Sequence, residues 1–266
     1  MKQAPVRAEL SVQALGAATL ERMSEAPAYN KWTYHRIAPW IGPRVLEVGA
    51  GIGNLSQFFI DRERVVLTDT ESEYREALWR RFGEQRKGER RRSNRDVGKD
   101  RRSGTDRRAL NVQVMELSLP TVPDALVGEQ FSTIVCLNVL EHVEDDMASL
   151  RTMFQLLEPN GRLVLLVPAL PALFGTMDTE LGHVRRYTPK VLESAFAETG
   201  LLMRHMEYFN LVGTIGWWWS GRVRRRKMIP KGPLKIFDLL VPIFRLERLI
   251  PWRVGLSLIA IGERPE

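Results

Sequence analysis

Short runs of β-branched and other apolar residues recur along the chain, and stretches with helical spacing of apolar residues separate several of them. The apolar runs lie at residues 44–48, 65–68, 112–115, 132–137 and 162–167. Helical spacing occurs at residues 55–61, 71–82 and 144–157. Apolar runs without polar alternation are typical of strands buried on both faces. The pattern therefore predicts an α/β protein with a mostly parallel sheet and helices on both faces.

Composition excludes several other classes of protein. The chain has 266 residues, of which 44% are hydrophobic and 27% charged, so it can bury a large core and is no collagen, coiled coil or wholly disordered chain. Cys136 is its one cysteine, which excludes a disulfide framework or a multi-cysteine metal site and fits a reducing, cytoplasmic setting. We expect no bound metal. Arg7 and Glu9 interrupt the N-terminal segment, and no apolar stretch reaches the ~18 residues of a membrane span, so we expect neither a secretory signal nor a transmembrane helix.

The formal net charge of +7 is concentrated in two segments. Residues 84–109 and 221–235 carry a strong excess of Lys and Arg, which leaves the rest of the chain mildly acidic. The first segment has almost no apolar residues, so we interpret 84–110 as a disordered basic insertion in a surface loop. It is either a solvated loop without a specific role or a binding site for nucleic acid or another polyanion.

A glycine-rich loop follows the first predicted strand directly, with the sequence Gly49-Ala50-Gly51-Ile52-Gly53-Asn54. Such a loop lets backbone N–H groups approach a ligand, although it can also serve only to pack a helix on a strand. A dinucleotide fingerprint needs glycine where Asn54 stands, which argues against NAD or FAD. Asp69 ends the second predicted strand, where an acidic side chain can accept both ribose hydroxyls. The combination favours an adenosine ligand without a pyrophosphate.

Two segments resemble motifs of the class I S-adenosylmethionine-dependent methyltransferases. Residues 45–53 are similar to the family's cofactor loop, and residues 131–142 are similar to its fourth-strand motif. The resemblance extends from about Trp32 to Leu201. It implies a Rossmann-like, seven-stranded, mostly parallel sheet whose last strand, near 255–261, is antiparallel beside the sixth. It also implies that S-adenosyl-L-methionine is the cofactor.

Carried over residue by residue, the resemblance implies a set of cofactor contacts. Gly49 and Gly51 would line the methionine part, Asp69 would hold the ribose, and Glu116 and Leu117 would flank the adenine, although the family more often has Asp at the position of Glu116. The full set that we expect to bind the cofactor comprises Glu47, Gly49, Ala50, Gly51, Gly53, Asp69, Thr70, Glu116, Leu117 and Asn138.

Methyl transfer to a hydroxyl is helped by a general base, and two histidines are placed to supply one. His142 follows the fourth strand and His183 lies in the loop after the fifth, so both can face one cleft. Alternatively, His142 packs under the cofactor. Arg185, Arg186 and Tyr187 follow His183 and are expected to bind a polar or anionic acceptor, unless their salt bridges only pin the loop.

Residues 182–187 also resemble a bacterial branch of the family that is often associated with glycan or lipid-linked substrates. Farther on, Trp217, Trp218 and Trp219 precede a cationic stretch and a second apolar segment at 236–244. Tryptophan and basic residues favour an anionic membrane surface, while the alternative is that the tryptophans fill the core of a cap. We therefore expect a methyltransferase that O-methylates a small or lipid-linked glycan-type acceptor, peripherally bound to the inner face of the membrane.

The domain organisation that follows has four parts: an N-terminal helical segment at 1–43, a cofactor-binding core at 44–210, a helical aromatic and basic cap at 211–252, and a final strand and tail at 253–266. Two other functions stay open at this point. One is a non-catalytic adenosine-ligand binding protein, since folds do not fix functions. The other is an RNA-associated methyltransferase that uses the basic insertion. Residues 138–141 lack the N-P-P-Y-like motif of adenine-N6 methyltransferases, which argues against methylation of nucleic acid at that atom.

Overall fold

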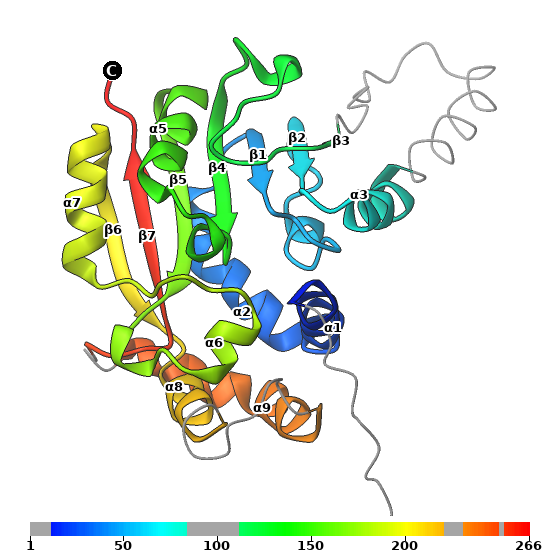
Figure 1. Cartoon of the computed structure of the whole chain (residues 1–266), viewed down its shortest axis with the longest axis vertical. Helices are drawn as coiled ribbons and strands as arrows, with labels where there is room; N and C mark the ends of the chain where they lie inside the picture. Colours follow the sequence, from blue (N-terminus) through cyan, green and yellow to red (C-terminus); the bar gives the residue numbers. More distant parts are fainter. Residues whose placement is uncertain (1–11, 84–111, 221–230, 250–252) are drawn as a thin grey trace, which may run out of the picture.

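A computed structural model describes residues 12–83, 112–220, 231–249 and 253–266, and it contains a seven-stranded sheet (Figure 1). The sheet order is β3-β2-β1-β4-β5-β7-β6, and β7 is antiparallel to both of its neighbours. The predicted antiparallel strand beside the sixth is therefore confirmed. The strands are β1 (Arg44–Val48), β2 (Arg64–Thr68), β3 (Val112–Met115), β4 (Phe131–Leu137), β5 (Leu157–Pro168), β6 (Leu202–Phe209) and β7 (Ser257–Glu263).

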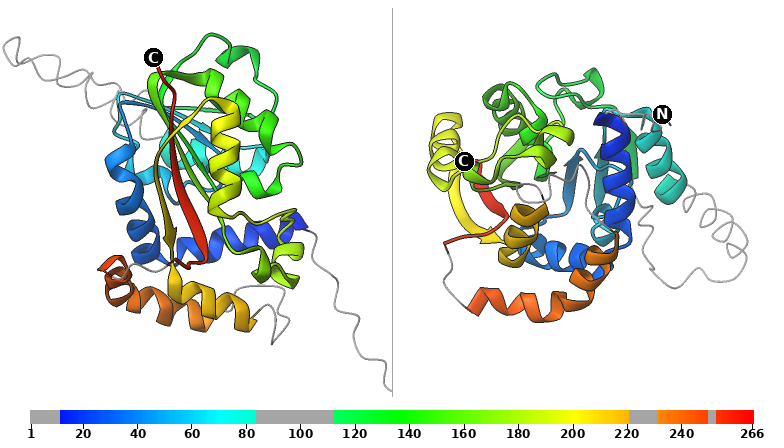
Figure 2. Two further views of the ribbon diagram at one scale, coloured as in Figure 1. Left: turned by 90° about the vertical axis from the view of Figure 1, so that its left-hand side faces the viewer. Right: turned by 60° about the horizontal axis from the view of Figure 1, so that its bottom comes forward.

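Helices cover both faces of the sheet, as the alternating pattern predicts (Figure 2). One hydrophobic core joins the sheet to α5 and α7, and a second joins the opposite face to α2, α3 and α9. The two cores alternate along a strand because successive side chains point to opposite faces. The helices are α1 (Val12–Ser24), α2 (Pro27–Ile37), α3 (Ser72–Leu78), α5 (Asp146–Leu156), α6 (Thr176–Glu180), α7 (Pro189–Thr199), α8 (Leu211–Trp218) and α9 (Lys231–Phe244).

The helix predicted at residues 55–61 is wrong. Only a three-residue 3-10 turn, Ser56–Phe58, forms there. Gly53 has a φ of 80°, and the Gln57 side chain donates a hydrogen bond to the Asn54 carbonyl, so an α-helical hydrogen-bond ladder does not develop. The apolar spacing reflects burial of Phe59 in the core under β1 and β2 instead of a helical face.

The order of the strands reverses between β1 and β4, which is where sheets of this kind bind ligands. Both strands end at the edge of the sheet around which α1, α6, α8 and α9 gather (Figure 1). The loops after β1, β4 and β5 therefore meet beneath this helical layer. The basic insertion at 84–110 and the cationic residues 222–227 lie outside the described residues. Within the part of the chain that is described, no helix is long and apolar enough to cross a bilayer.

Candidate active site

The glycine loop after β1 adopts a backbone that only glycine tolerates well. Gly49, Gly51 and Gly53 have φ values of 69°, 55° and 80°. This left-handed region costs an L-residue about 1–2 kcal/mol. A Cβ atom on Gly49 would also lie 2.3 Å from the Cγ2 atom of Val139, the second residue after β4. The loop after β4 thus closes on the loop after β1, and little room remains between the two.

Asp69 lies at the carboxyl end of β2 and holds this loop in place. Its Oδ2 atom accepts a hydrogen bond from the Gly51 N–H at 2.8 Å, and its Oδ1 atom accepts one from the Glu71 N–H at 3.0 Å. Burial raises the pKa of Asp69 from its ordinary value. Each carboxylate oxygen has a second lone pair, so the pair of oxygens can still accept hydrogen bonds from two vicinal hydroxyl groups. The residues present therefore fit an adenosyl cofactor.

Glu47 is buried on β1 immediately before the glycine loop. Its carboxyl group accepts a hydrogen bond from the Ser56 hydroxyl. Burial raises the pKa of Glu47 to about 8, and neighbouring Asp69 adds to the effect, while the hydrogen bond from Ser56 opposes it. Burial therefore favours the protonated form of Glu47 in the folded protein.

The other residues expected at the cofactor line the same edge of the sheet with different exposure. Leu117 is buried, while Glu116 is exposed and forms an ion pair with Arg75 at 2.9 Å. Asn138 follows β4 with a φ of 54°, its side chain is exposed, and its N–H donates to the Leu166 carbonyl at 2.8 Å. Ala50 is buried and Thr70 is exposed.

Helix α1 contributes a contact that the sequence analysis missed. A Cβ atom on Gly51 would lie 3.1 Å from the Leu20 Cδ1 atom, and the Asn54 side chain donates a hydrogen bond to the Leu20 carbonyl at 3.0 Å. Leu20 therefore covers the glycine loop from the outside. No motif marks this residue, and only the packing of α1 across the edge of the sheet identifies it.

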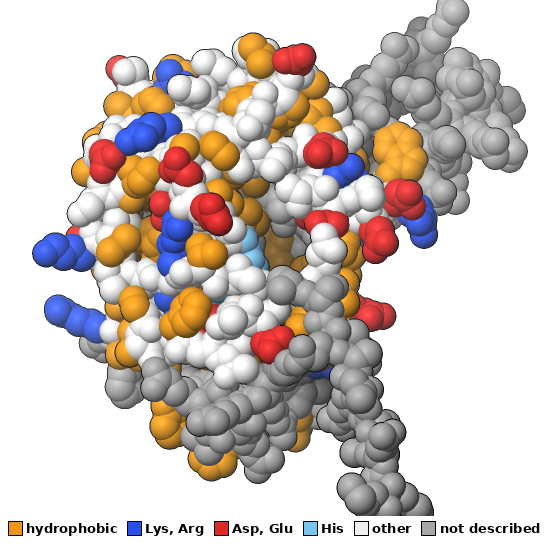
Figure 3. All heavy atoms as spheres, viewed as in Figure 1, with side chains coloured by type: hydrophobic (Ala, Val, Ile, Leu, Met, Phe, Trp, Pro, Cys, Tyr) orange, Lys and Arg blue, Asp and Glu red, His pale blue; other side chains and the backbone are white. Residues whose placement is uncertain are grey.

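The two candidate catalytic histidines lie together. The ring centroids of His142 and His183 are 4.8 Å apart, and the rings meet edge to face. His142 belongs to η5 (Leu140–His142), the 3-10 turn after β4, while His183 lies in the loop between α6 and α7. His142 is exposed as a whole, but partial desolvation of its ring and the neighbouring His183 together lower its pKa to about 4. In the space-filling view, histidine atoms are visible in a hollow in the middle of this face (Figure 3).

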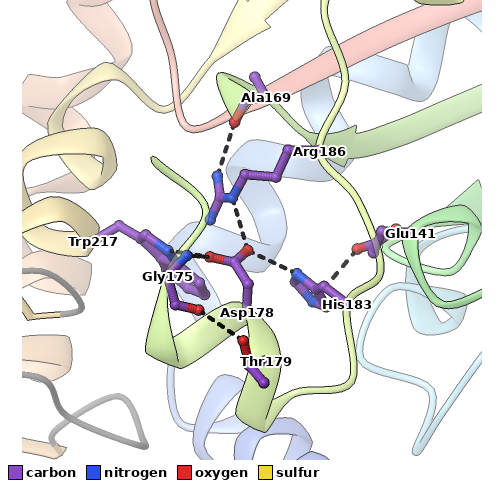
Figure 4. Close-up of polar contacts among 8 residues, drawn as sticks. All are labelled: Glu141, Ala169, Gly175, Asp178, Thr179, His183, Arg186 and Trp217. Carbon is purple, nitrogen blue, oxygen red and sulfur yellow. Dashed lines mark hydrogen bonds and ion pairs between the residues drawn. The ribbon is translucent and has the colours of Figure 1, made fainter. Parts of the chain in front are cut away.

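Asp178 orients His183 from α6 (Figure 4). The His183 Nδ1 atom lies 3.0 Å from the Asp178 Oδ1 atom, which directs the Nε2 atom toward Glu141, 3.9 Å from its Oε1 atom. The same carboxylate accepts hydrogen bonds from Arg186 Nε at 2.7 Å and from Trp217 Nε1 at 3.3 Å. Burial alone would raise the pKa of Asp178, but the hydrogen bonds from His183 and Arg186 outweigh it and hold the pKa below its ordinary value. Asp178 is therefore ionised, and it contacts three other side chains of this site.

The residues expected to bind the acceptor have partners within the protein. The buried Arg186 guanidinium pairs with Asp178 and donates to the Ala169 carbonyl at 2.9 Å, and the Tyr187 hydroxyl donates to Asp146 Oδ2 at 2.9 Å. These internal partners favour the alternative that Arg186 and Tyr187 pin the loop, because an acceptor would have to displace them to reach the same polar groups. Arg185 is more exposed and pairs with Asp146 at 2.7 Å.

Glu141 is a residue that the sequence motif contains but that we did not predict as functional. Its side chain is fully buried, and neither carboxyl oxygen has a hydrogen-bond partner among the described residues. Burial raises the pKa of Glu141 to about 7, although nearby His183 lowers it. The Val184 N–H donates to the Glu141 carbonyl at 2.9 Å, which joins the loop after β4 to the loop that carries His183.

Comparison with protein-family models places this site in a family. A model described as a methyltransferase domain matches residues 11–206, which is well over half of the chain. The chain belongs to this methyltransferase family. It is an S-adenosylmethionine-dependent methyltransferase, and its glycine loop and Asp69 lie at the carboxyl ends of β1 and β2, the edge at which sheets of this kind bind ligands. No curated protein matches the chain.

Solved structures of low sequence identity share the fold of this methyltransferase. A structure from the complex of the Haloferax volcanii Trm112 methyltransferase activator with a methyltransferase is 13% identical, with 96% of each chain covered and a TM-score of 0.57. The N-methyltransferase NodS of Bradyrhizobium japonicum WM9, in complex with S-adenosyl-L-homocysteine, is 13% identical, with 89% of this chain and 85% of that chain covered and a TM-score of 0.51. At these identities, the likeness establishes the fold alone.

Proposed function

We propose that this methyltransferase transfers a methyl group to a hydroxyl of a small or lipid-linked glycan-type acceptor at a membrane surface. The observation that supports it best is the Asp178–His183 pair at the same end of the sheet as the glycine loop, with 3.0 Å between Oδ1 and Nδ1. A hydroxyl nucleophile benefits from a base that accepts its proton, and a carboxylate-oriented imidazole is such a base. An amine that is already deprotonated needs no such help, so the pair favours oxygen as the methylated atom.

The cofactor in this proposal lies over the carboxyl ends of β1, β2 and β4. Gly49, Ala50, Gly51 and Gly53 approach its methionine part through their backbone, and Asp69 accepts the ribose hydroxyls. Leu117 and Glu116 flank the adenine, while Asn138 lines the pocket. S-adenosylmethionine supplies the activated methyl group when bound. The protein then aligns the acceptor and excludes water.

His183 is the general base that we propose, with His142 beside it. Asp178 keeps the His183 proton on Nδ1 and leaves the Nε2 lone pair, on the side of the ring toward Glu141, to accept the proton of the acceptor. His142 is a weaker base because its pKa is lowered to about 4. Arg185 pairs with Asp146 at the rim, and in this proposal the more exposed part of its guanidinium meets an anionic group of the acceptor. In this proposal, the acceptor packs against the His142 ring.

An exposed apolar surface supports the membrane part of the proposal. On α9, the residues Leu234 and Val241 are buried against the body of the protein, and Asp238 accepts hydrogen bonds from the N–H groups of Ala28 and Tyr29 at the start of α2. The opposite side of the helix is also apolar. The exposed apolar surface comprises Ile236, Leu239 and Ile243 of α9, Leu246 and Leu249 beyond it, and Ile215, Trp218 and Trp219 at the end of α8.

A soluble surface helix normally presents polar residues to water, so an apolar outer side indicates a surface that becomes covered. The helices α8 and α9 lie at the same end of the sheet (Figure 2). We propose that residues 211–252 form a cap whose outer side rests on the inner face of an anionic membrane. Lys and Arg near anionic lipid contribute about 1 kcal/mol each, and the sequence supplies several at 222–227.

Liposome cosedimentation tests this surface. Leu239→Asp removes an exposed leucine from α9, and full burial of a leucine is worth about 1.5–3 kcal/mol, so we expect binding to anionic vesicles to weaken roughly 10-fold or more. Val191→Asp is the matched control, because Val191 is 51% exposed on α7. Replacing Arg224, Arg225 and Arg226 with Ala is expected to release the protein as well. Equal sedimentation of all four proteins contradicts the membrane proposal.

A methyl-transfer screen tests the acceptor class. The protein is incubated with methyl-labelled S-adenosylmethionine and cell-envelope extracts, soluble metabolites or RNA in separate reactions. We expect label in the lipid-extractable glycan fraction, joined through an ether that survives mild alkali. His183→Asn is expected to slow this transfer while leaving cofactor affinity unchanged. Label that appears only in amines or in RNA contradicts the proposal.

A further inference from the structure

We propose that Glu141, His142 and His183 together bind one divalent transition-metal ion at the mouth of the active site. The site rests on the proposed O-methyl transfer but replaces its direct general-base step, because the ion and not the His183 ring would activate the acceptor hydroxyl; its existence can be tested without any acceptor. The three residues come from two segments about forty positions apart in sequence, and no assignment of a metal to them follows from the fold.

The spacing of the ligand atoms fits a common ion. One carboxylate oxygen of Glu141 and one ring nitrogen from each histidine all lie within 4.8 Å of one another. An ion with bonds of about 2.0–2.2 Å keeps its ligand atoms roughly 3–4 Å apart. Small rotations of three side chains therefore suffice to close the site, and the His183 Nε2 and Glu141 Oε1 atoms, 3.9 Å apart, already have a suitable separation.

Glu141 supplies an independent reason to expect a cation. Its side chain has no exposed surface, and its oxygens accept no hydrogen bond from any residue that the structure describes. A buried carboxylate without a hydrogen-bond partner is costly. Nearby His183 and Arg186 favour its ionised form, but neither donates a hydrogen bond to it, and the Arg186 guanidinium pairs with Asp178 at 2.7 Å. A metal ion at the mouth of the site would satisfy both carboxyl oxygens.

The surroundings of His183 match those of a metal-binding histidine. Metal-ligating imidazoles almost always donate their second ring N–H to a carboxylate or carbonyl, which fixes the ring and raises its basicity. Asp178 occupies that position, 3.0 Å from His183 Nδ1, and is itself fixed by Arg186 (Figure 4). The hydrogen bond from Val184 N–H to the Glu141 carbonyl fixes the two ligand-bearing loops relative to each other.

The three ligand side chains limit which ions can bind and what a bound ion can do. Two imidazoles and one carboxylate are typical of Zn²⁺, Fe²⁺, Mn²⁺ or Co²⁺ and leave coordination positions open. His142 is the exposed member of the set, so the open positions face the cleft. An acceptor hydroxyl that coordinates there loses its proton to water more readily, and its oxygen then attacks the methyl carbon as the carbon–sulfur bond breaks. In this arrangement, His183 acts through the ion and does not take the proton itself.

Metal titration of the full chain tests the site directly. Chelator-treated protein is titrated with Co²⁺ while the visible absorption is recorded, and with Zn²⁺ in a calorimeter. We expect one ion per chain and a Co²⁺ spectrum with nitrogen and oxygen ligation. His142→Ala, at the exposed ligand, and Glu141→Gln are each expected to weaken binding roughly tenfold or more. His35→Ala is the matched control, because His35 is an exposed histidine on α2, and it should bind the ion as the wild type does.

Two results would overturn the proposal. One is the absence of stoichiometric binding of either ion to the wild type at millimolar concentration. The other is binding that His142→Ala and Glu141→Gln both leave unchanged, with circular dichroism showing that each variant is folded. Neither result touches the methyltransferase activity, which S-adenosylmethionine binding and methyl transfer report separately. If methyl transfer proceeds with full rate in chelator-treated protein, the general-base role of His183 stands and the metal role is rejected.

Discussion

The buried carboxyl group of Glu47 makes the stability of this protein depend on pH in a way that one substitution should remove. Burial raises its pKa to about 8 in the folded protein, against an ordinary value of 4.5. Between these two values, the folded state holds a proton on Glu47 that the unfolded state has released. The folded state therefore binds more protons, and stability falls as pH rises.

The size of this pH dependence follows from the binding of one proton. Each pH unit within this window lowers the free energy of unfolding by about 1.4 kcal/mol, whatever the exact position of the raised pKa. Between about pH 5.5 and about pH 7.5, the titration of Glu47 alone therefore lowers the free energy of unfolding of the wild type by about 2.7 kcal/mol. Glu47→Gln keeps a neutral side chain of the same shape beside Ser56, and it removes the proton uptake. The variant should gain stability over the wild type by that amount across the window.

Urea unfolding at several pH values, followed by circular dichroism, measures this difference. Glu141 also has a raised pKa, but it contributes equally to both proteins and cancels in the comparison, whereas the interaction of Asp69 with Glu47 is part of the measured difference. The expected signature is a difference in unfolding free energy that grows linearly with pH and levels off near pH 8. Parallel pH profiles of the two proteins would refute the assignment of a buried, protonated Glu47.

Two further predictions concern the packing of the site. Asp178→Asn should destabilise the fold by about 3–5 kcal/mol in urea unfolding, because it leaves the buried Arg186 guanidinium without a counterion, whereas Asp145→Asn at the exposed cap of α5 should change stability by less than about 1 kcal/mol. Gly49→Ala should cost at least about 1–2 kcal/mol from its positive φ alone, whereas Gly16→Ala in α1, where a Cβ meets nothing within 4 Å, should be neutral or stabilising. Equal melting temperatures within either pair contradict the corresponding argument.

The interior strands could be predicted from sequence because each is buried on both faces. β1, β2 and β4 therefore appear as continuous apolar runs, and their predicted bounds differ from the observed ones by one residue at most. β5 begins at Leu157, earlier than predicted, since Glu158-Pro159-Asn160-Gly161 has the composition of a turn. β6 had no predicted bounds, because polar residues such as Arg204 and Glu207 interrupt its apolar pattern.

From sequence, only those parts of the site could be predicted that a motif within one continuous segment identifies. The glycine loop and Asp69 have such motifs, and so do the positions of the two histidines after their strands. The pairing of Asp178 with His183 and the approach of Glu141 to His183 depend on the backbone hydrogen bond between Val184 and Glu141, which joins segments distant in sequence. Whether Arg186 faces an acceptor or an internal carboxylate is likewise decided by tertiary packing alone.

An adenosyl cofactor held by Asp69 is the central feature of the proposed site, and calorimetric titration with S-adenosylmethionine tests it most directly. A hydrogen bond to a charged group contributes about 1.5–3 kcal/mol, so we expect Asp69→Ala to weaken binding at least roughly 10-fold. Asp124→Ala, at an exposed carboxylate elsewhere, should bind as the wild type does. A folded Asp69→Ala variant with wild-type affinity, or a wild type that binds no S-adenosylmethionine, would contradict the account.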